Sequence, residues 1–90
     1  MSYNFEFSAV LTKKLSKLAR KDPLLVRSLH KKVEQIISCD KEGMMHYKNL
    51  VGDMSDLKRV HIGHHVLLFR ILEDTVIFED LRHHDDAYKD

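Results

Sequence analysis

The sequence predicts a small α+β domain in which two helices cover one face of a single β-sheet. Three observations lead to this fold class. The chain has 90 residues, which suffice for one hydrophobic core but not for two. Its apolar residues alternate at the N-terminus, recur at helical spacing in the middle, and form short runs separated by turns towards the C-terminus. A strand, a helical hairpin and a three-stranded antiparallel meander pack as one sheet against two helices, so residues 1–90 are expected to form one domain.

The first strand is expected over residues 3–7, where Tyr3, Phe5 and Phe7 alternate with polar residues. From Ala9 the apolar positions follow helical spacing, and Ser8 is placed to act as the N-cap. The residues that this helix should contribute to the core are Leu11, Leu15 and Leu18.

A second helix is expected to begin at Pro23, with Asp22 as its cap, and to run to about Ser38. Since so short a junction separates the two helices, they should form an antiparallel hairpin. The core residues expected from the second helix are Leu29, Val33 and Ile36.

The second half of the chain predicts the meander. Residues 40–43 are expected to form a polar connection, residues 44–50 an irregular segment and residues 52–56 a turn. The elements expected after them are a strand over residues 57–62, a hairpin turn at Gly63-His64, a central strand from Val66 to Ile71, a turn at Glu73-Asp74, and a last strand from Thr75 to about Leu81. Alternation in the first of these strands places Arg59 and His61 on one face, with Val60 and Ile62 on the other.

The composition excludes several classes of protein. A single cysteine, Cys39, cannot form an internal disulfide, a Cys-rich zinc site or a redox dithiol. The longest apolar run, from Val66 to Phe69, is far shorter than the roughly 20 residues of a membrane span. The N-terminus also lacks the pattern of a signal peptide, so we expect a soluble, cytoplasmic protein.

Charge and histidine are unevenly distributed. Residues 1–70 contain 13 Lys/Arg and 7 Asp/Glu, a balance of +6, whereas residues 71–90 contain 2 and 7, a balance of −5. The positive charge of residues 1–70, called the basic body below, could bind a polyanion such as nucleic acid, although a solvated helix face gives the same pattern. Histidine is the less usual signal, because five of the seven histidines fall in the last 30 residues.

The segments RVHIGHHVLLFRI and TVIFEDLRHHDDAY, in this element order, resemble the RelE/ParE toxin superfamily of type II toxin–antitoxin systems. Most telling is the ending, in which a last strand is followed by a histidine, three residues and an aromatic, here His84 and Tyr88. Residues 50–69 are similar to the YafQ branch of the superfamily.

The resemblance implies an endoribonuclease that cleaves messenger RNA, commonly on the ribosome, and that a cognate antitoxin silences in a toxin–antitoxin complex. Neither a metal nor a cofactor is expected. Fold alone does not secure this activity, because the ParE branch has the same architecture but inhibits DNA gyrase without a nuclease site. A gyrase-directed toxin, or one that has decayed to a binding module, is therefore the alternative.

Metal-free RNA cleavage needs a base for the 2′-hydroxyl, an acid for the leaving 5′-oxygen and cations around the phosphorane. By resemblance, His84 is the general acid, and Tyr88 stacks on a base or touches the phosphate. His65 stands where relatives have Arg or Asp and is a candidate base or phosphate ligand. His61 matches a strand histidine of the YafQ branch, with a surface hydrogen bond as its alternative role.

Three basic residues complete the candidate site. Lys48 matches a loop cation that steers the phosphate, and Lys58 and Arg59 occupy the strand on which RelE-type enzymes have paired basic residues. Arg59 is the candidate for the charge of the transition state.

Histidines gathered on one sheet could instead ligate zinc or nickel. Adjacent strand histidines point to opposite faces, which argues against such a site and leaves His83 a structural residue. The antitoxin, encoded by the adjacent gene, should be acidic to complement the basic body.

Overall fold

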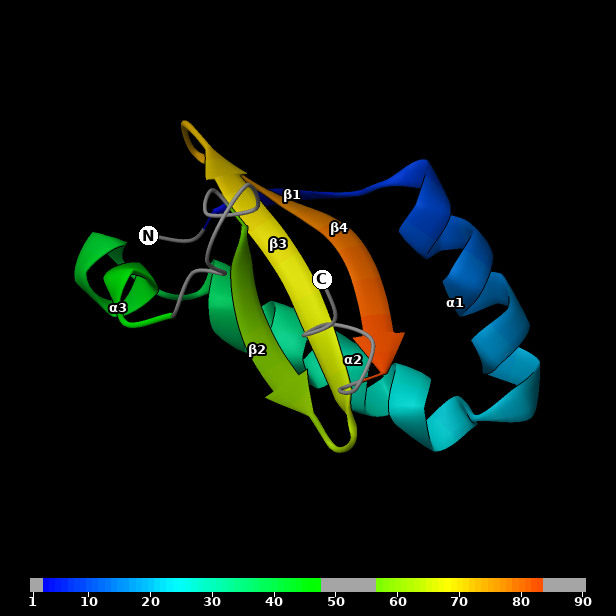
Figure 1. The fold of residues 1–90 in the computed structure, drawn as a ribbon. Coiled ribbons are helices and arrows are strands. Elements are labelled where there is room, and N and C mark those ends of the chain that lie inside the picture. Colours follow the sequence, from blue (N-terminus) through cyan, green and yellow to red (C-terminus); the bar gives the residue numbers. More distant parts are fainter. Residues whose placement is uncertain (1–2, 48–56, 84–90) are drawn as a thin grey trace.

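The computed structural model describes residues 3–47 and 57–83, and it confirms the predicted α+β fold (Figure 1). The predicted turn at residues 52–56 lies outside the described residues. The elements in chain order are β1 (Asn4–Phe7), α1 (Ala9–Lys21), α2 (Pro23–Ile37), α3 (Lys41–Met45), β2 (Lys58–Ile62), β3 (His65–Leu72) and β4 (Thr75–His83).

Both long helices begin at the predicted caps. The Ser8 hydroxyl accepts a hydrogen bond from the Leu11 N–H at 3.0 Å, and the Asp22 carboxylate accepts one from the Leu25 N–H at 3.1 Å. Pro23 is the first residue of α2, where its missing N–H is not needed. The hairpin prediction is confirmed, with α1 and α2 diverging from their junction at Asp22 (Figure 1).

The short helix α3 corrects the prediction of a polar connection followed by an irregular segment. Its cap is Asp40, whose carboxylate accepts a hydrogen bond from the Gly43 N–H at 2.7 Å. Met44 is buried in the core with 2% of its surface exposed, whereas Met45 is 80% exposed. A cap and one buried anchor are sufficient for a single helical turn, even though Gly43 lowers the helical propensity of the segment.

The four strands form one sheet in the order β1-β4-β3-β2. The meander β2-β3-β4 is antiparallel as predicted, and β1 pairs with β4 in parallel, with Asn4 opposite Thr75. Gly63 adopts a φ of 60° in the turn between β2 and β3, a conformation that glycine adopts without steric cost. The pairing of β3 with β4 shifts register at Leu68/Phe69, where a bulge interrupts the ladder.

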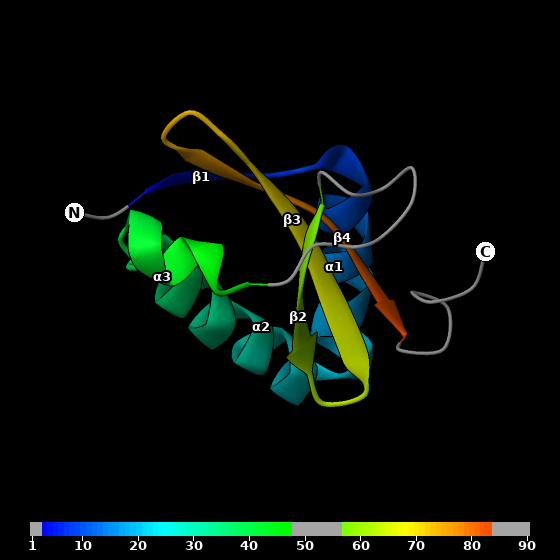
Figure 2. The same cartoon turned by 60° about the vertical axis from the view of Figure 1, so that its left-hand side comes forward.

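The main core lies between the sheet and the helices. Figure 2 shows α1 and α2 on the same side of the sheet. Fully buried residues from both helices and from β3 and β4 meet there: Leu11, Leu29, Ile36, Leu67, Phe69, Val76 and Phe78. On the other face, Val66 and Leu68 form a smaller cluster with Leu57. Because β3 contributes to both clusters, its sequence is a continuous apolar run.

No helix in the described part of the chain is long and apolar enough to cross a membrane.

Candidate functional site

Four of the seven predicted site residues can be placed in the structure. Lys58, Arg59 and His61 lie on β2, and His65 is the first residue of β3. The other three, Lys48, His84 and Tyr88, lie outside the described residues.

Strand pairing divides the placed residues between the two faces of the sheet. His61 lies opposite Val66 and Arg59 opposite Leu68, so both share the face of the smaller cluster. Lys58 lies opposite Phe69, on the face that meets the helices, and its Nζ donates a hydrogen bond to the Tyr47 carbonyl at 3.3 Å. Lys58 therefore fastens the segment that follows α3 to the sheet.

His65 is on the helix-facing side, and its cross-strand partner is His83. The two imidazole centroids are 5.5 Å apart, with the rings at 74° to each other. Burial lowers the pKa of His65, and the neighbouring His83 lowers it further, whereas Asp22 acts weakly in the opposite direction. These surroundings therefore favour the neutral form of His65, which can accept a proton.

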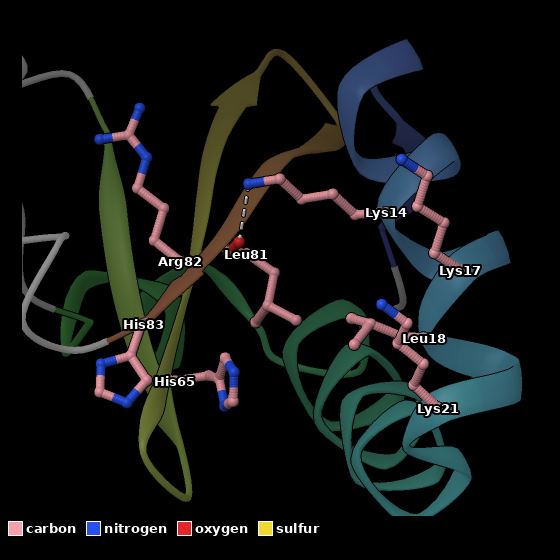
Figure 3. Close-up of a pocket in the computed structure, with 8 residues that line it drawn as sticks. All are labelled: Lys14, Lys17, Leu18, Lys21, His65, Leu81, Arg82 and His83. Atoms are coloured by element: carbon pink, nitrogen blue, oxygen red, sulfur yellow. Dashed lines mark hydrogen bonds between the residues drawn. The ribbon is translucent and has the colours of Figure 1, made fainter.

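This histidine pair forms one end of a cleft between α1 and the C-terminal half of β4 (Figure 3). The cleft has a volume of about 350 Å³. Its walls are Lys14, Lys17, Leu18 and Lys21 from α1, Leu81, Arg82 and His83 from β4, and His65 from β3. Every polar side chain in this lining is a cation or an imidazole, so the cleft is suited to an anion.

Asp80 holds two of the cations at the cleft in place. Its carboxylate accepts hydrogen bonds from the Lys14 Nζ at 2.6 Å, from the Arg82 Nε at 3.0 Å and from the Leu81 N–H at 2.8 Å. Burial alone would raise the pKa of Asp80, but the hydrogen bonds from Lys14 and Arg82 outweigh it and hold the pKa below its usual value. The Lys14 Nζ also donates to the Leu81 carbonyl at 3.1 Å, which ties α1 to β4.

Sequence reasoning missed several residues of this cleft. His83 was treated as structural, yet the register of β3 with β4 places it beside His65. Arg82 and the three lysines were not singled out as a site. The spacing of Lys14, Lys17 and Lys21 places them on one face of a helix, a signal that could have been found.

Among the residues that the structure describes, no group of three or more His, Cys, Asp or Glu side chains could hold a metal ion. The chemistry that the described lining can supply is that of a neutral imidazole base beside fixed cations. Such an arrangement can take a proton from a hydroxyl and bind a phosphate next to it.

Comparison with known proteins identifies the family. A sequence model of the family described as the ParE toxin of the type II toxin–antitoxin system, parDE, matches residues 5–88. A protein of Methanocaldococcus jannaschii, provisionally named toxin RelE4, is 41% identical over 90 residues, which cover 97% of this chain and 92% of the relative.

Solved structures share the fold. The toxin–antitoxin complex RelBE2 from Mycobacterium tuberculosis matches with a TM-score of 0.65 and 22% identity, over 92% of this chain and 99% of the matched chain. The DinJ–YafQ toxin–antitoxin complex from E. coli matches with a TM-score of 0.71 and 17% identity, over 99% of this chain and 100% of the matched chain. The family model and the archaeal relative each span nearly the whole chain, and this protein therefore belongs to the ParE toxin family, within the RelE/ParE superfamily of type II toxins.

Proposed function

We propose that this toxin is a metal-independent endoribonuclease that cleaves messenger RNA, on the ribosome, and thereby inhibits translation in the cytoplasm. The observation that carries the proposal is the pair of His65 and His83 at the end of a cationic cleft. A base with a lowered pKa beside phosphate-binding cations is what cleavage through the 2′-hydroxyl requires.

The roles follow from the chemistry. His65 accepts the proton of the 2′-hydroxyl, and the 2′-oxygen of the RNA attacks the adjacent phosphorus. The bond from phosphorus to the 5′-oxygen breaks, and a general acid protonates that oxygen; by resemblance this acid is His84. The products are a 2′,3′-cyclic phosphate, or the 3′-phosphate formed by its hydrolysis, and a 5′-hydroxyl.

Cations must neutralise the charge that develops on the phosphorane. Arg82 is fixed by Asp80 and lies opposite Val66, on the face of the sheet that also carries Arg59, so we assign this role to Arg82 together with Arg59. His61, on the same face as Arg59 and Arg82, is assigned to binding RNA that passes the end of the sheet.

The remaining predicted residues are assigned to binding the RNA. Lys48 is assigned to steering the phosphate, Tyr88 to stacking on a base, and Lys58, whose Nζ binds the Tyr47 carbonyl, to a supporting position. The roles of Lys48 and Tyr88 are those that the resemblance implies, whereas the role of Lys58 follows from its hydrogen bond to Tyr47.

A cognate antitoxin, acidic and encoded by the adjacent gene, is the proposed partner. The two solved relatives described above are toxins in complex with an antitoxin. The excess of positive charge in residues 1–70 favours an acidic antitoxin, because complementary charge accelerates the association of the two proteins.

Cleavage of a defined messenger RNA by the purified toxin, with and without ribosomes and with EDTA, tests the proposed reaction. EDTA should leave the cleavage unchanged, and the 3′ ends should carry a cyclic or 3′-phosphate. His65→Ala and His84→Ala should each lower the rate by about 10²- to 10⁴-fold. His64→Ala is the matched control, because His64 is exposed in the hairpin turn and lies outside the cleft lining. Activity lost with EDTA and restored by zinc would contradict the mechanism.

A toxin directed at DNA gyrase is the second candidate, because the matching family model is that of ParE. Pulse labelling of cells that express the toxin separates the two functions. Protein synthesis should stop before DNA synthesis if the toxin cleaves messenger RNA, and the reverse order would support gyrase as the target.

A further inference from the structure

Three lysines of α1 face the cleft, and they differ in what they bind. Lys14 is engaged, since its Nζ donates to the Asp80 carboxylate and to the Leu81 carbonyl. Lys17 and Lys21 are exposed, and neither makes a hydrogen bond or an ion pair with any residue in the described ranges. Their ammonium groups are therefore available to an anion that enters the cleft.

The arrangement of these two lysines fits a nucleic acid strand. They are four positions apart on α1, so their Cβ atoms are about 5–6 Å apart along the helix. Figure 3 shows both on α1, across the cleft from Leu81 and His65, whereas the Arg82 side chain extends away from α1. A phosphate in the cleft can contact Lys17 or Lys21 on the α1 wall, and a second phosphate along the strand can contact the next lysine of the row.

Apolar side chains on both sides of the cleft favour a nucleotide over a simple ion. Leu18 lies between the two lysines in sequence, and Leu81 is on the opposite wall with 4% of its surface exposed. A ribose or a base can lie against Leu18 while its phosphate contacts a lysine. The cleft volume of about 350 Å³ is at the small end of the range for ligand sites, the size of one nucleotide unit rather than of a folded protein segment.

We infer that Lys17 and Lys21 form a phosphate-binding subsite for single-stranded RNA next to the scissile bond, which holds the strand against His65. The inference rests on the proposed ribonuclease function. It adds α1 to the substrate-binding surface as the element that binds the RNA backbone independently of base sequence.

Direct binding tests the subsite without relying on cleavage. The ligand is a fluorescein-labelled oligoribonucleotide with 2′-O-methyl groups, which lacks the attacking hydroxyl, and its affinity is measured by fluorescence anisotropy over a range of salt concentrations. The variant Lys17→Gln/Lys21→Gln should bind more weakly. The slope of log affinity against log salt should fall by about 0.7 for each lost contact, equally for oligonucleotides of different sequence.

The matched control is Lys13→Gln/Arg20→Gln. Both of these residues are exposed on α1 outside the cleft lining, so this variant loses the same charge from the same helix. Its salt slope should remain that of the unmodified protein. Equal slopes for the two double variants, or no binding by the unmodified protein, would overturn the inference.

Further outcomes separate this inference from its alternatives. If the unmodified protein binds with the expected slopes but cleaves no RNA, the ribonuclease proposal fails and the subsite stands as a nucleic-acid site. If Lys17→Gln/Lys21→Gln loses affinity for the antitoxin while RNA binding is unchanged, the cleft is an antitoxin interface and the inference is wrong. Thermal unfolding midpoints equal to that of the parent exclude misfolding as the cause.

Discussion

At the scale of single residues, the groups around His65 shift the pKa of its imidazole in opposite directions. Burial and the neighbouring His83 disfavour its charged form, whereas Asp22 favours it. The first two effects dominate, and the pKa of His65 lies below its ordinary value of 6.5. The folded protein therefore binds a proton at His65 less tightly than the unfolded chain does.

This shift predicts the pH dependence of cleavage. The acidic limb of kcat/KM reports the base of the free enzyme, so it should lie below pH 6.5. The same shift reduces stability as the pH falls from 6.5 towards the pKa of the folded state, and it has no effect on stability above that window. NMR titration of the His65 ring beside the pH–rate profile checks both statements. A His65 pKa at or above 6.5 would contradict them.

Asp80 should matter for activity although it lies outside the cleft lining. Asp80→Asn keeps the shape of the side chain but removes the charge that holds Lys14 and Arg82. We expect a lower kcat, because Arg82 is no longer fixed, and a loss of about 1 kcal/mol of stability, a value reduced by the partial exposure of Lys14 and Arg82.

The stability effect of Asp80→Asn should vanish in acid. The pKa of Asp80 is lowered in the folded state, so its contribution is present above the unfolded value of 3.8 and is lost as the pH falls below it. Glu79→Gln on the same strand is the control. Glu79 pairs with Arg70 at 2.9 Å, away from the cleft, so its replacement should leave kcat unchanged. Equal kcat values for the two variants would show that Asp80 does not position the cations.

The sequence predicted part of the cleft. His65 could be identified by its resemblance to a family position, and alternation along β2 correctly placed Arg59 and His61 on a shared face. His83 could not be identified, because its neighbour across the strands depends on a register that a bulge shifts. The spacing of the α1 lysines indicates a basic helix face, but periodicity does not show which other element lies beside that face.

At the scale of elements, Ser8 joins α1 to the sheet. Its hydroxyl accepts the Leu11 N–H as the helix cap, and it also donates a hydrogen bond to the Glu79 carbonyl next to the β-bulge. The Ser8 N–H donates to the Phe78 carbonyl at 2.9 Å. One small residue thus fixes the start of α1 against the strand that forms the opposite wall of the cleft.

Ser8→Ala should therefore destabilise the protein by about 1–2 kcal/mol, because the helix loses its cap. Chemical denaturation of the purified toxin measures the effect. Ser16→Ala is the matched control, since the Ser16 hydroxyl only donates to the Thr12 carbonyl on the exposed side of the same helix. This control should be neutral or slightly stabilising, because alanine is the better helix former. Equal midpoints for the two variants would contradict the role of Ser8.

Elements with local signals were predicted well. The ends of α1 and α2 follow from Ser8, Asp22 and Pro23, which act within one turn of the chain. α3 was not predicted, because Gly43 lowers the helical propensity of a short polar segment and the burial of Met44 is a tertiary effect. The alternation in β1 predicted a strand, but nothing in it specified the parallel pairing with β4.

At the scale of the whole molecule, positive charge dominates the first 70 residues and negative charge the last 20. This asymmetry predicts that association with the product of the adjacent gene is steered by charge. The association rate should fall steeply with added salt, while dissociation changes little. Stopped-flow mixing of separately refolded partners measures both rates. A neighbouring gene product that fails to bind would count against the proposed complex.

The parallel pairing of β1 with β4 joins the first and the last strand of the described part of the chain. Ser8 and Glu79, which are hydrogen-bonded to each other, are 71 positions apart in the chain. Since ribosomes add about 5–20 residues per second, β1 is synthesised seconds before β4, the strand with which it pairs. A nascent chain that stops before Arg82 and His83 also has no second wall for its cleft. The cleft is therefore complete only after β4 has been synthesised.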